Sequence, residues 1–165
     1  MKGYFLKPGF IFFAAEPTMI LSVLGSSVAI TLYDPVRRIG GMNHYIYPRL
    51  EEQARATALY AQPATLQLLR MFRRTGSPLQ HLQAHLMGGA YKPGAAAEIR
   101  KLGEQNVDIA RDMLKRYQIP ILGTDTGGPW GRKIVFNSAT GEVVIAKVHK
   151  IRESDWYPGE LPARR

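Results

Sequence analysis

The stretch MILSVLGSSVAITLY, residues 19–33, decides the fold that this sequence predicts. Apolar and β-branched residues fill both of its ends, and the small residues Gly25, Ser26 and Ser27 lie in its middle. This pattern is typical of a buried strand, a tight bend and then a second strand or the start of a helix. A turn at Asp34-Pro35 ends the stretch.

Further extended segments are expected on both sides of this stretch. Residues 10–13 are a short strand or a docking segment, and residues 39–47 are a second extended segment interrupted by two glycines. Residues 79–87 are predicted to be a strand that runs into a glycine turn. The C-terminal part adds a strand that begins at residues 119–123 and a hairpin of residues 134–136 and 143–148.

Two segments have the apolar spacing of helices. The first is residues 50–74, where Pro63 is expected to divide or kink the helix. The second is residues 98–117, broken at Gly103, with Asn106 as a candidate N-cap of its second half. Because strands and helices alternate without a regular βαβ pattern, we expect a mixed α/β sandwich.

The expected organisation is one domain over residues 1–150, followed by a polar, loosely held tail of residues 151–165. With 165 residues, 45% of them apolar, the chain can bury the core of a single domain. Its longest apolar run is interrupted by serines and a glycine and falls short of the ~20 residues that span a bilayer. The N-terminus also lacks a convincing signal-peptide cleavage site, so we expect a cytoplasmic protein.

Composition restricts the chemistry and the partners of the chain. It contains no cysteine, which excludes disulfides, cysteine-bound zinc and thiol catalysis. Its formal charge of +9 predicts an acidic partner, which could be nucleic acid, an anionic membrane face or an acidic protein surface. A nucleic-acid-binding domain is the more distant alternative, because the only dense basic cluster, residues 70–74, ends a predicted helix whose dipole it complements.

Residues that could carry chemistry gather at the glycine-serine bend and just beyond it. A hydrolase needs a nucleophile on a tight turn and a histidine base within hydrogen-bond reach. Ser26 or Ser27 could be the nucleophile and His44 the base. Serines are also common structural residues in turns, and a single histidine is often only a buried hydrogen-bonded group, so the residues alone leave both interpretations open.

Other patterns give weaker indications. His81 and His85 have the i, i+4 spacing of metal ligands on a helix, but their segment is predicted to be extended and no carboxylate is near. His149 is a further isolated histidine. The glycine-rich residues 127–132 lack the spacing of a phosphate-binding loop and precede a strand. We therefore predict neither a metal nor a cofactor.

Taken together, several ordered motifs resemble the CheD family of bacterial chemotaxis proteins. Residues 24–30, LGSSVAI, are similar to the family's LGSCVAV, and residues 39–44, IGGMNH, are similar to its GGMNH segment after a shared DP turn. The resemblance continues with GGA at residues 88–90, GEQNV at residues 103–107 and DTGG at residues 125–128. It implies a mixed β-sandwich with helices on its outer faces, similar to the catalytic domain of deamidating bacterial toxins.

The resemblance also implies an activity, that of a protein-glutamine glutaminase. In this family a cysteine attacks the side-chain amide of glutamines on the cytoplasmic helices of chemoreceptors and converts them to glutamate. A histidine is the base, and a threonine upstream of the cysteine orients it. In this sequence the base falls on His44 and the nucleophile on Ser27, while the threonine falls on Leu21, where the neighbouring Ser22 could supply the hydroxyl.

Ser27 and Leu21 depart from the family pattern at the site itself. A thiol with a pKa of about 8.5 is partly ionised beside a histidine, whereas a serine hydroxyl must lose its proton during the attack. We therefore expect deamidation to be slow or absent. Three explanations remain open: an engineered cysteine-to-serine exchange, a natural non-catalytic relative that binds receptors or a CheC-type phosphatase, and a serine-dependent deamidase.

Overall fold

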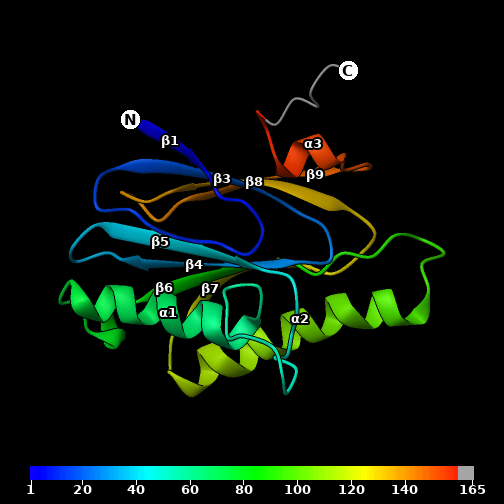
Figure 1. Cartoon of the computed structure of the whole chain (residues 1–165). Coiled ribbons are helices and arrows are strands. Elements are labelled where there is room, and N and C mark those ends of the chain that lie inside the picture. Colours follow the sequence, from blue (N-terminus) through cyan, green and yellow to red (C-terminus); the bar gives the residue numbers. More distant parts are fainter. Residues whose placement is uncertain (160–165) are drawn as a thin grey trace.

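The computed structural model describes residues 1–159, which form strands, helices and one 3-10 helix (Figure 1). In chain order the elements are β1 (Lys2–Phe5), β2 (Ile11–Phe13), β3 (Thr18–Leu24), β4 (Val28–Asp34), β5 (Ile39–Tyr45), α1 (Ala61–Arg74), η1 (Leu79–His81), β6 (Gln83–Gly88), α2 (Ala97–Arg116), β7 (Ile121–Thr126), β8 (Gly131–Asn137), β9 (Val143–Val148) and α3 (Glu153–Trp156).

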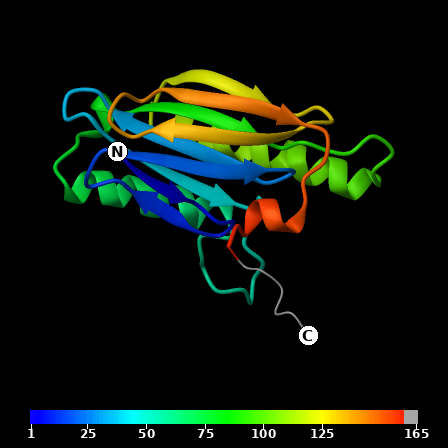
Figure 2. The same cartoon turned by 90° about the horizontal axis from the view of Figure 1, so that it is seen from above.

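The strands form two mixed sheets that lie face to face (Figures 1 and 2). One sheet has the order β1-β3-β8-β9 and the other the order β2-β5-β4-β6-β7. Only β1 with β3 and β6 with β7 pair in parallel among the named strands. The expected mixed α/β sandwich is therefore confirmed.

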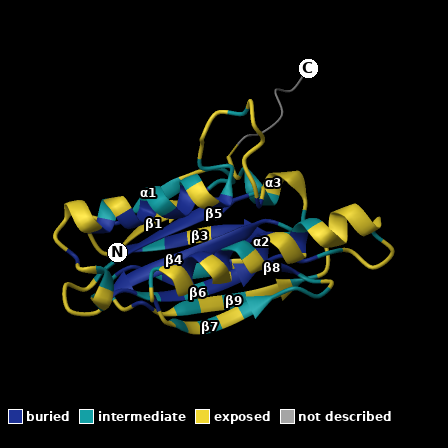
Figure 3. Cartoon of the chain, turned by 90° about the horizontal axis from the view of Figure 1, so that it is seen from below, coloured by how far each residue is buried: buried dark blue, intermediate teal, exposed yellow. Residues whose placement is uncertain are grey.

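Two apolar layers hold this architecture together. The layer between the sheets is built from residues that alternate inward along their strands: Leu6, Ile20, Leu24, Ala29, Met42, Ile134 and Phe136. The second layer lies between the five-stranded sheet and the helices α1 and α2, whose outward faces are exposed (Figure 3). The short helix α3 contacts β3 of the other sheet.

The first predicted helix is shorter than expected. Helix α1 begins at Ala61, and residues 50–60 form turns and irregular backbone. Pro63 is the third residue of the helix. The first four N–H groups of a helix make no intrahelical hydrogen bond, so the missing N–H of Pro63 causes no kink. Ala64, Leu68 and Phe72, each four residues apart, form the buried stripe that packs on the sheet.

The second predicted helix is continuous, so the expected break at Gly103 is wrong. Helix α2 runs without interruption from Ala97 to Arg116. Asn106 is consequently not an N-cap but a fully buried residue in the middle of the helix. Neither this helix nor another one within residues 1–159 is long and apolar enough to cross a membrane.

Two end segments contain structure that the sequence patterns missed. Strand β1 pairs with β3 from Lys2 to Phe5, although residues 2–5 show no strong alternation. In the predicted tail, residues 153–156 form α3, and Asp155 accepts a hydrogen bond from Lys133 of β8. The end of that tail, residues 160–165, lies outside the described residues.

Candidate active site

The predicted bend at residues 25–27 carries the chain from one sheet to the other, from the end of β3 to the start of β4. Ser27, the last residue of the bend, is only 8% exposed. Its carbonyl accepts a hydrogen bond from Gly89 N at 2.9 Å, and the carbonyl of Gly25 accepts one from Ala90 N at 2.9 Å. The turn after β6 therefore holds the bend in place from the neighbouring strand.

Gly88 makes this close contact between the two turns possible. Its φ is +117°, a conformation that residues with a side chain rarely adopt. A Cβ atom at this position would lie 2.1 Å from the carbonyl oxygen of Ser27, far inside van der Waals contact. The GGA motif is thus explained by the shape of the backbone around Ser27.

His44 lies between the two sheets with no exposed surface. It belongs to β5, where it pairs with Ala29 of β4, so its ring is placed beside the start of β4. The Nε2 atom of His44 is 2.8 Å from the Oγ atom of Ser27. The structure thereby brings together the nucleophile and base positions expected from the sequence.

Ser22 supplies the third member of this group from β3. Its Oγ is 2.9 Å from Nδ1 of His44 and donates a hydrogen bond to the carbonyl of Leu6 at 2.7 Å. Because that carbonyl can only accept, the Ser22 hydroxyl proton is used there, and Nδ1 must carry the proton that it shares with Ser22. Nε2 is then unprotonated and accepts from the Ser27 hydroxyl.

This arrangement leaves the imidazole neutral and oriented as a base. Burial lowers the pKa of His44 from 6.5 to about 4, and the nearby Leu6 carbonyl acts in the opposite direction. At neutral pH the ring is therefore unprotonated at Nε2, the form required to accept a proton. The low pKa also makes it a weak base for an alcohol, and none of the described contacts of His44 is with a carboxylate.

Leu21, the position where the family threonine falls, lies away from the site. Successive residues of a strand point to opposite faces, and in β3 Ile20 and Ser22 face inward while Leu21 is 37% exposed on the outer face. A hydroxyl at position 21 would not reach the imidazole. The hydroxyl next to His44 therefore comes from Ser22.

A pocket of about 520 Å³ opens beside the bend. Its lining includes Ser26, Tyr91 and Lys92, and the C-terminal segment contributes Ile151 and Trp156. The Trp156 ring packs over the bend, because a Cβ atom at Gly25 would lie 3.6 Å from it. No acidic side chain is among the described residues that line the pocket. The pocket therefore leaves the bend open on this side at Gly25 and Ser26.

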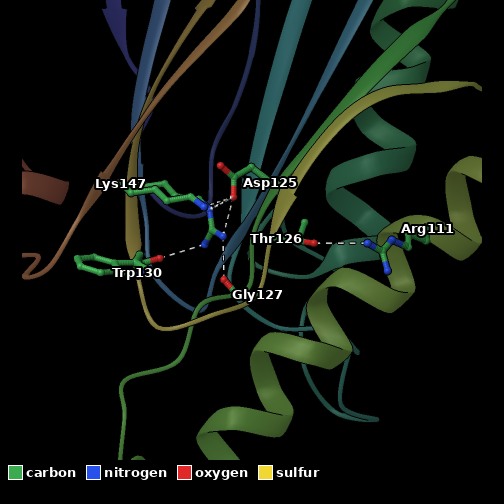
Figure 4. Close-up of polar contacts among 7 residues, drawn as sticks. Arg111, Asp125, Thr126, Gly127, Trp130 and Lys147 are labelled. Atoms are coloured by element: carbon green, nitrogen blue, oxygen red, sulfur yellow. Dashed lines mark hydrogen bonds and ion pairs between the residues drawn. The ribbon is translucent and has the colours of Figure 1, made fainter.

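Polar contacts of the buried Arg132 hold the turn between β7 and β8, and Pro129 of this turn lines the pocket (Figure 4). The guanidinium of Arg132, 2% exposed, donates to Asp125 at 2.9 and 3.0 Å and to the carbonyls of Gly127 and Trp130 at 2.8 and 3.0 Å. Gly127 N in turn donates to the carbonyl of Gly88 at 2.9 Å. Residues 127–130 are thus a turn whose carbonyls are held by Arg132, the second residue of β8.

The other histidines lie apart from this group. His81 is in η1, with its Nδ1 3.7 Å from Asp34, and His85 is in β6, so the two do not share a helix face. His149 lines the pocket and lies against Trp130, with ring centroids 3.6 Å apart and the ring planes tilted by 55°. Within residues 1–159 no group of three His, Cys, Asp or Glu side chains is placed to hold a metal ion.

Two residues that contact the bend were not predicted to do so, Asn106, which donates to the Ser26 carbonyl, and Trp156. The spacing of Asn106 from Gly103, Val107 and Ala110 places it on the apolar face of the helix and not at a cap. That spacing was the available signal. Trp156 belongs to the segment predicted to be a loose tail, and an isolated aromatic residue in a polar tail carries no comparable signal.

Comparison with known proteins adds a family to this geometry. Residues 48–147 match the family described as CheD chemotactic sensory transduction. Similar curated proteins include "Probable chemoreceptor glutamine deamidase CheD 1" of Anaeromyxobacter dehalogenans, 42% identical over 87% of this chain and 84% of the relative. The protein named "Probable chemoreceptor glutamine deamidase CheD" of Trichlorobacter lovleyi is 36% identical over 89% of this chain and 91% of its own length.

Proposed function

The chain belongs to the CheD family of chemotaxis proteins, and from this premise we propose that it recognises glutamine side chains of chemoreceptors and hydrolyses them slowly to glutamate. Ser27 is the nucleophile, His44 the base and Ser22 the residue that orients the base. The observation that carries the proposal is the unbroken hydrogen-bonded series from Ser27 through His44 and Ser22 to the Leu6 carbonyl.

The proposed reaction is a two-step acyl transfer. Ser27 Oγ attacks the amide carbon of the glutamine side chain while its proton passes to His44 Nε2. The C–N bond then breaks, and the amide nitrogen leaves as ammonia with that proton, so that an ester remains on Ser27. Water attacks the ester, Nε2 accepts a proton from it, and return of that proton to Ser27 releases glutamate. Each step uses only the described residues and water.

The rate should be far below that of a thiol in the same place. An alcohol stays protonated at neutral pH, and its proton must be taken during the attack by an imidazole whose pKa burial lowers to about 4. A deficit of about 4 kcal/mol in the barrier would slow the reaction roughly a thousandfold. Slow hydrolysis by a fully assembled site therefore follows from the serine at position 27.

The proposal includes the surroundings in which the protein acts. The relatives' names specify chemoreceptors. The family resemblance implies that the target glutamines lie on the cytoplasmic helices of these receptors, so the chain is expected in the cytoplasm. Its charge of +9 suits glutamate-rich helices. A CheC-type phosphatase is the second partner that family membership suggests.

The proposal can be tested with a chemoreceptor cytoplasmic fragment and mass spectrometry, which detects the gain in mass as an amide becomes a carboxylate. Ser27→Cys should raise the rate of deamidation by about a thousandfold. In that background Ser22→Ala should lower the rate at least about tenfold, because it frees the imidazole to change its tautomer. The matched control Leu21→Thr, on the outer face, should change nothing.

Two results would decide against the proposal. If Ser27→Cys deamidates no glutamine but the chain still retains the receptor fragment or the phosphatase in a pull-down, the protein is a non-catalytic adaptor. If it neither deamidates nor retains either partner, both forms of the proposed function fail. If Leu21→Thr accelerates the reaction, the orienting role belongs to position 21 and not to Ser22.

A further inference from the structure

Asn106 of α2 connects the two chain segments that carry the candidate nucleophile and base. Its side chain is fully buried, and its Nδ2 donates to the Ser26 carbonyl at 3.0 Å and to the Ile46 carbonyl at 2.8 Å. Ser26 directly precedes Ser27, and Ile46 follows His44 by two residues. One amide group therefore fixes the separation between the bend and the end of β5.

The backbone of the same residue adds a third bond. The hydroxyl of Tyr45, the residue after His44, donates to the carbonyl of Asn106 at 2.5 Å. Burial raises the pKa of Tyr45 well above its ordinary value, so the hydroxyl keeps its proton and remains a donor. Together the three bonds tie the bend and the end of β5 to one position of α2.

Helix α2 is also held tightly against the turn that supports Ser27. A Cβ atom at Gly103, one turn before Asn106, would lie 2.6 Å from the carbonyl oxygen of Gly89. Gly89 N is the group that donates to the Ser27 carbonyl. The helix therefore cannot shift by a fraction of an ångström at Asn106 without also displacing this turn.

Such control over distance matters for the chemistry. A misplacement of about 1 Å between reacting groups can lower a rate about a hundredfold. The asparagine side chain offers two N–H donors, which here go to two separate carbonyls. Ionised aspartate has the same shape but no donor, and glutamine has both donors but is longer by a methylene group.

We propose that Asn106 is a positioning residue that sets the distance between the side chain at position 27 and the imidazole of His44. The inference rests on the proposed function for the role of that pair, but it concerns a residue on another element. Asn106 touches no reacting atom in this arrangement. Its effect is exerted through the carbonyls of Ser26 and Ile46.

The absence of cysteine from the chain provides a specific probe. Ser27→Cys introduces a single thiol, whose rate of alkylation by iodoacetamide can be followed as a function of pH without any receptor. The readout is the dependence on His44, defined as the ratio of rates between the Ser27→Cys protein and its Ser27→Cys, His44→Gln form. We expect this ratio to be about ten near neutral pH, where a free thiol is only a few per cent ionised.

Adding Asn106→Leu, which removes both donors at similar volume, should reduce the ratio to about one and make the pH profile match that of the His44→Gln form. Asn106→Asp keeps the shape with at most one donor and should give an intermediate ratio. The matched control is Leu114→Ala, a cavity in the buried face of the same helix. It should lower the melting temperature and leave the ratio near ten.

An unchanged ratio in Asn106→Leu, at a loss of thermal stability similar to that of Leu114→Ala, would show that Asn106 is merely structural. If Asn106→Leu does not fold, Asn106→Asp decides by the same criterion. If alkylation of the Ser27→Cys protein depends on His44 but this protein deamidates no glutamine, the proposed function is contradicted. The positioning role of Asn106 is still decided in that case by the ratio of alkylation rates.

Discussion

His44 is the residue whose surroundings depart furthest from those of its type in solution. It is fully buried between two sheets, and both ring nitrogens are hydrogen-bonded to serine hydroxyls. Because hydroxyls do not compensate a positive charge as a carboxylate would, the neutral ring is favoured. The same environment that makes the imidazole a correctly oriented base therefore also makes it a weak one.

This environment predicts how stability depends on pH. The pKa of His44 is about 4 in the folded chain and 6.5 as an ordinary value, so below pH 6.5 the unfolded chain binds the proton more readily. The contribution of the neutral His44 to the free energy of unfolding is complete above pH 6.5. It is lost as the pH falls toward 4, by up to about 3 kcal/mol.

Urea unfolding at neutral pH and near pH 4.5 measures this loss, and His44→Gln is the reference because it cannot titrate. The free energy of unfolding should fall more steeply in the unmodified chain than in the variant, by roughly 2 to 3 kcal/mol over this range. Equal slopes in both proteins would mean that the imidazole is already protonated, or solvated, in the folded state.

At the residue scale, the sequence predicted the identity of the site better than its geometry. Ser27 and His44 follow from the glycine-serine bend and the GGMNH segment, and the structure brings them into contact. The family threonine falls on Leu21 in the sequence motif, yet strand alternation turns Ser22 inward instead. Applying the period of two to residues 18–24 would have favoured Ser22 from the start.

At the scale of single elements, the turn between β7 and β8 depends on one side chain. Arg132 is buried, and its guanidinium bonds Asp125 and two carbonyls of the turn that borders the pocket. Replacing Arg132 leaves the carbonyls of Gly127 and Trp130 without this donor. It also leaves Asp125, among its described ion pairs, only the longer contact with Lys147. Together these losses cost more than loss of an exposed pair.

We therefore expect Arg132→Met to lower the free energy of unfolding by about 3 kcal/mol, whereas Lys147→Met should cost less than about 1 kcal/mol. Lys147 is the matched control because it approaches the same Asp125 oxygen at 3.6 Å from an exposed position. Chemical denaturation of both variants measures the difference. Equal losses would show that the arginine contributes no more than a surface contact.

The extent of the helices was predictable from the spacing of apolar residues. The predictions were wrong where a single glycine, asparagine or proline was taken to interrupt a helix. Gly103 and Asn106 suggested a break in the second helix, but both lie on its buried face, where a small residue and an amide meet a neighbouring backbone. Pro63 similarly suggested a kink, although it lies in the first turn of α1. A glycine at a close contact with a neighbouring backbone can lie within a continuous helix, and a proline in the first turn of a helix removes no intrahelical hydrogen bond.

At the scale of the whole molecule, the sign of the charge and the position of the pocket favour an acidic partner. Lys92 lines the pocket beside the bend. Arg74 is the last residue of α1. Gly76, two residues later, lies near Arg37, which is at the opposite end of β4 from Ser27. Variants of Lys92 and Arg74 can therefore distinguish the effect of charge beside the pocket from the effect of the net charge of the protein.

We expect binding to a chemoreceptor fragment to weaken as ionic strength rises, and Lys92→Glu to lower the association rate constant about fivefold at low salt. Arg74→Glu makes the same change in net charge far from the pocket and should lower it less than about twofold. Stopped-flow or surface-binding kinetics would measure both. Equal effects would indicate that only the net charge of the protein matters, and not the pocket.

The assignment of strands to two sheets could not be predicted from the sequence. Residues 19–33 were predicted as a strand, a bend and then a strand or the start of a helix, and the structure has a strand there, but the pattern is the same for a hairpin within one sheet. What separates β3 from β4 is the pairing of each with distant partners, β8 for one and β6 for the other. Such long-range pairing leaves no local trace.

This crossing from sheet to sheet has a consequence for biosynthesis. Ser22 comes from the four-stranded sheet and His44 from the five-stranded one, and β8, the partner of β3, is synthesised more than a hundred residues after β3. A nascent or partly assembled chain thus lacks a competent triad. The proposed hydrolysis should therefore require a chain that has been synthesised at least through β8.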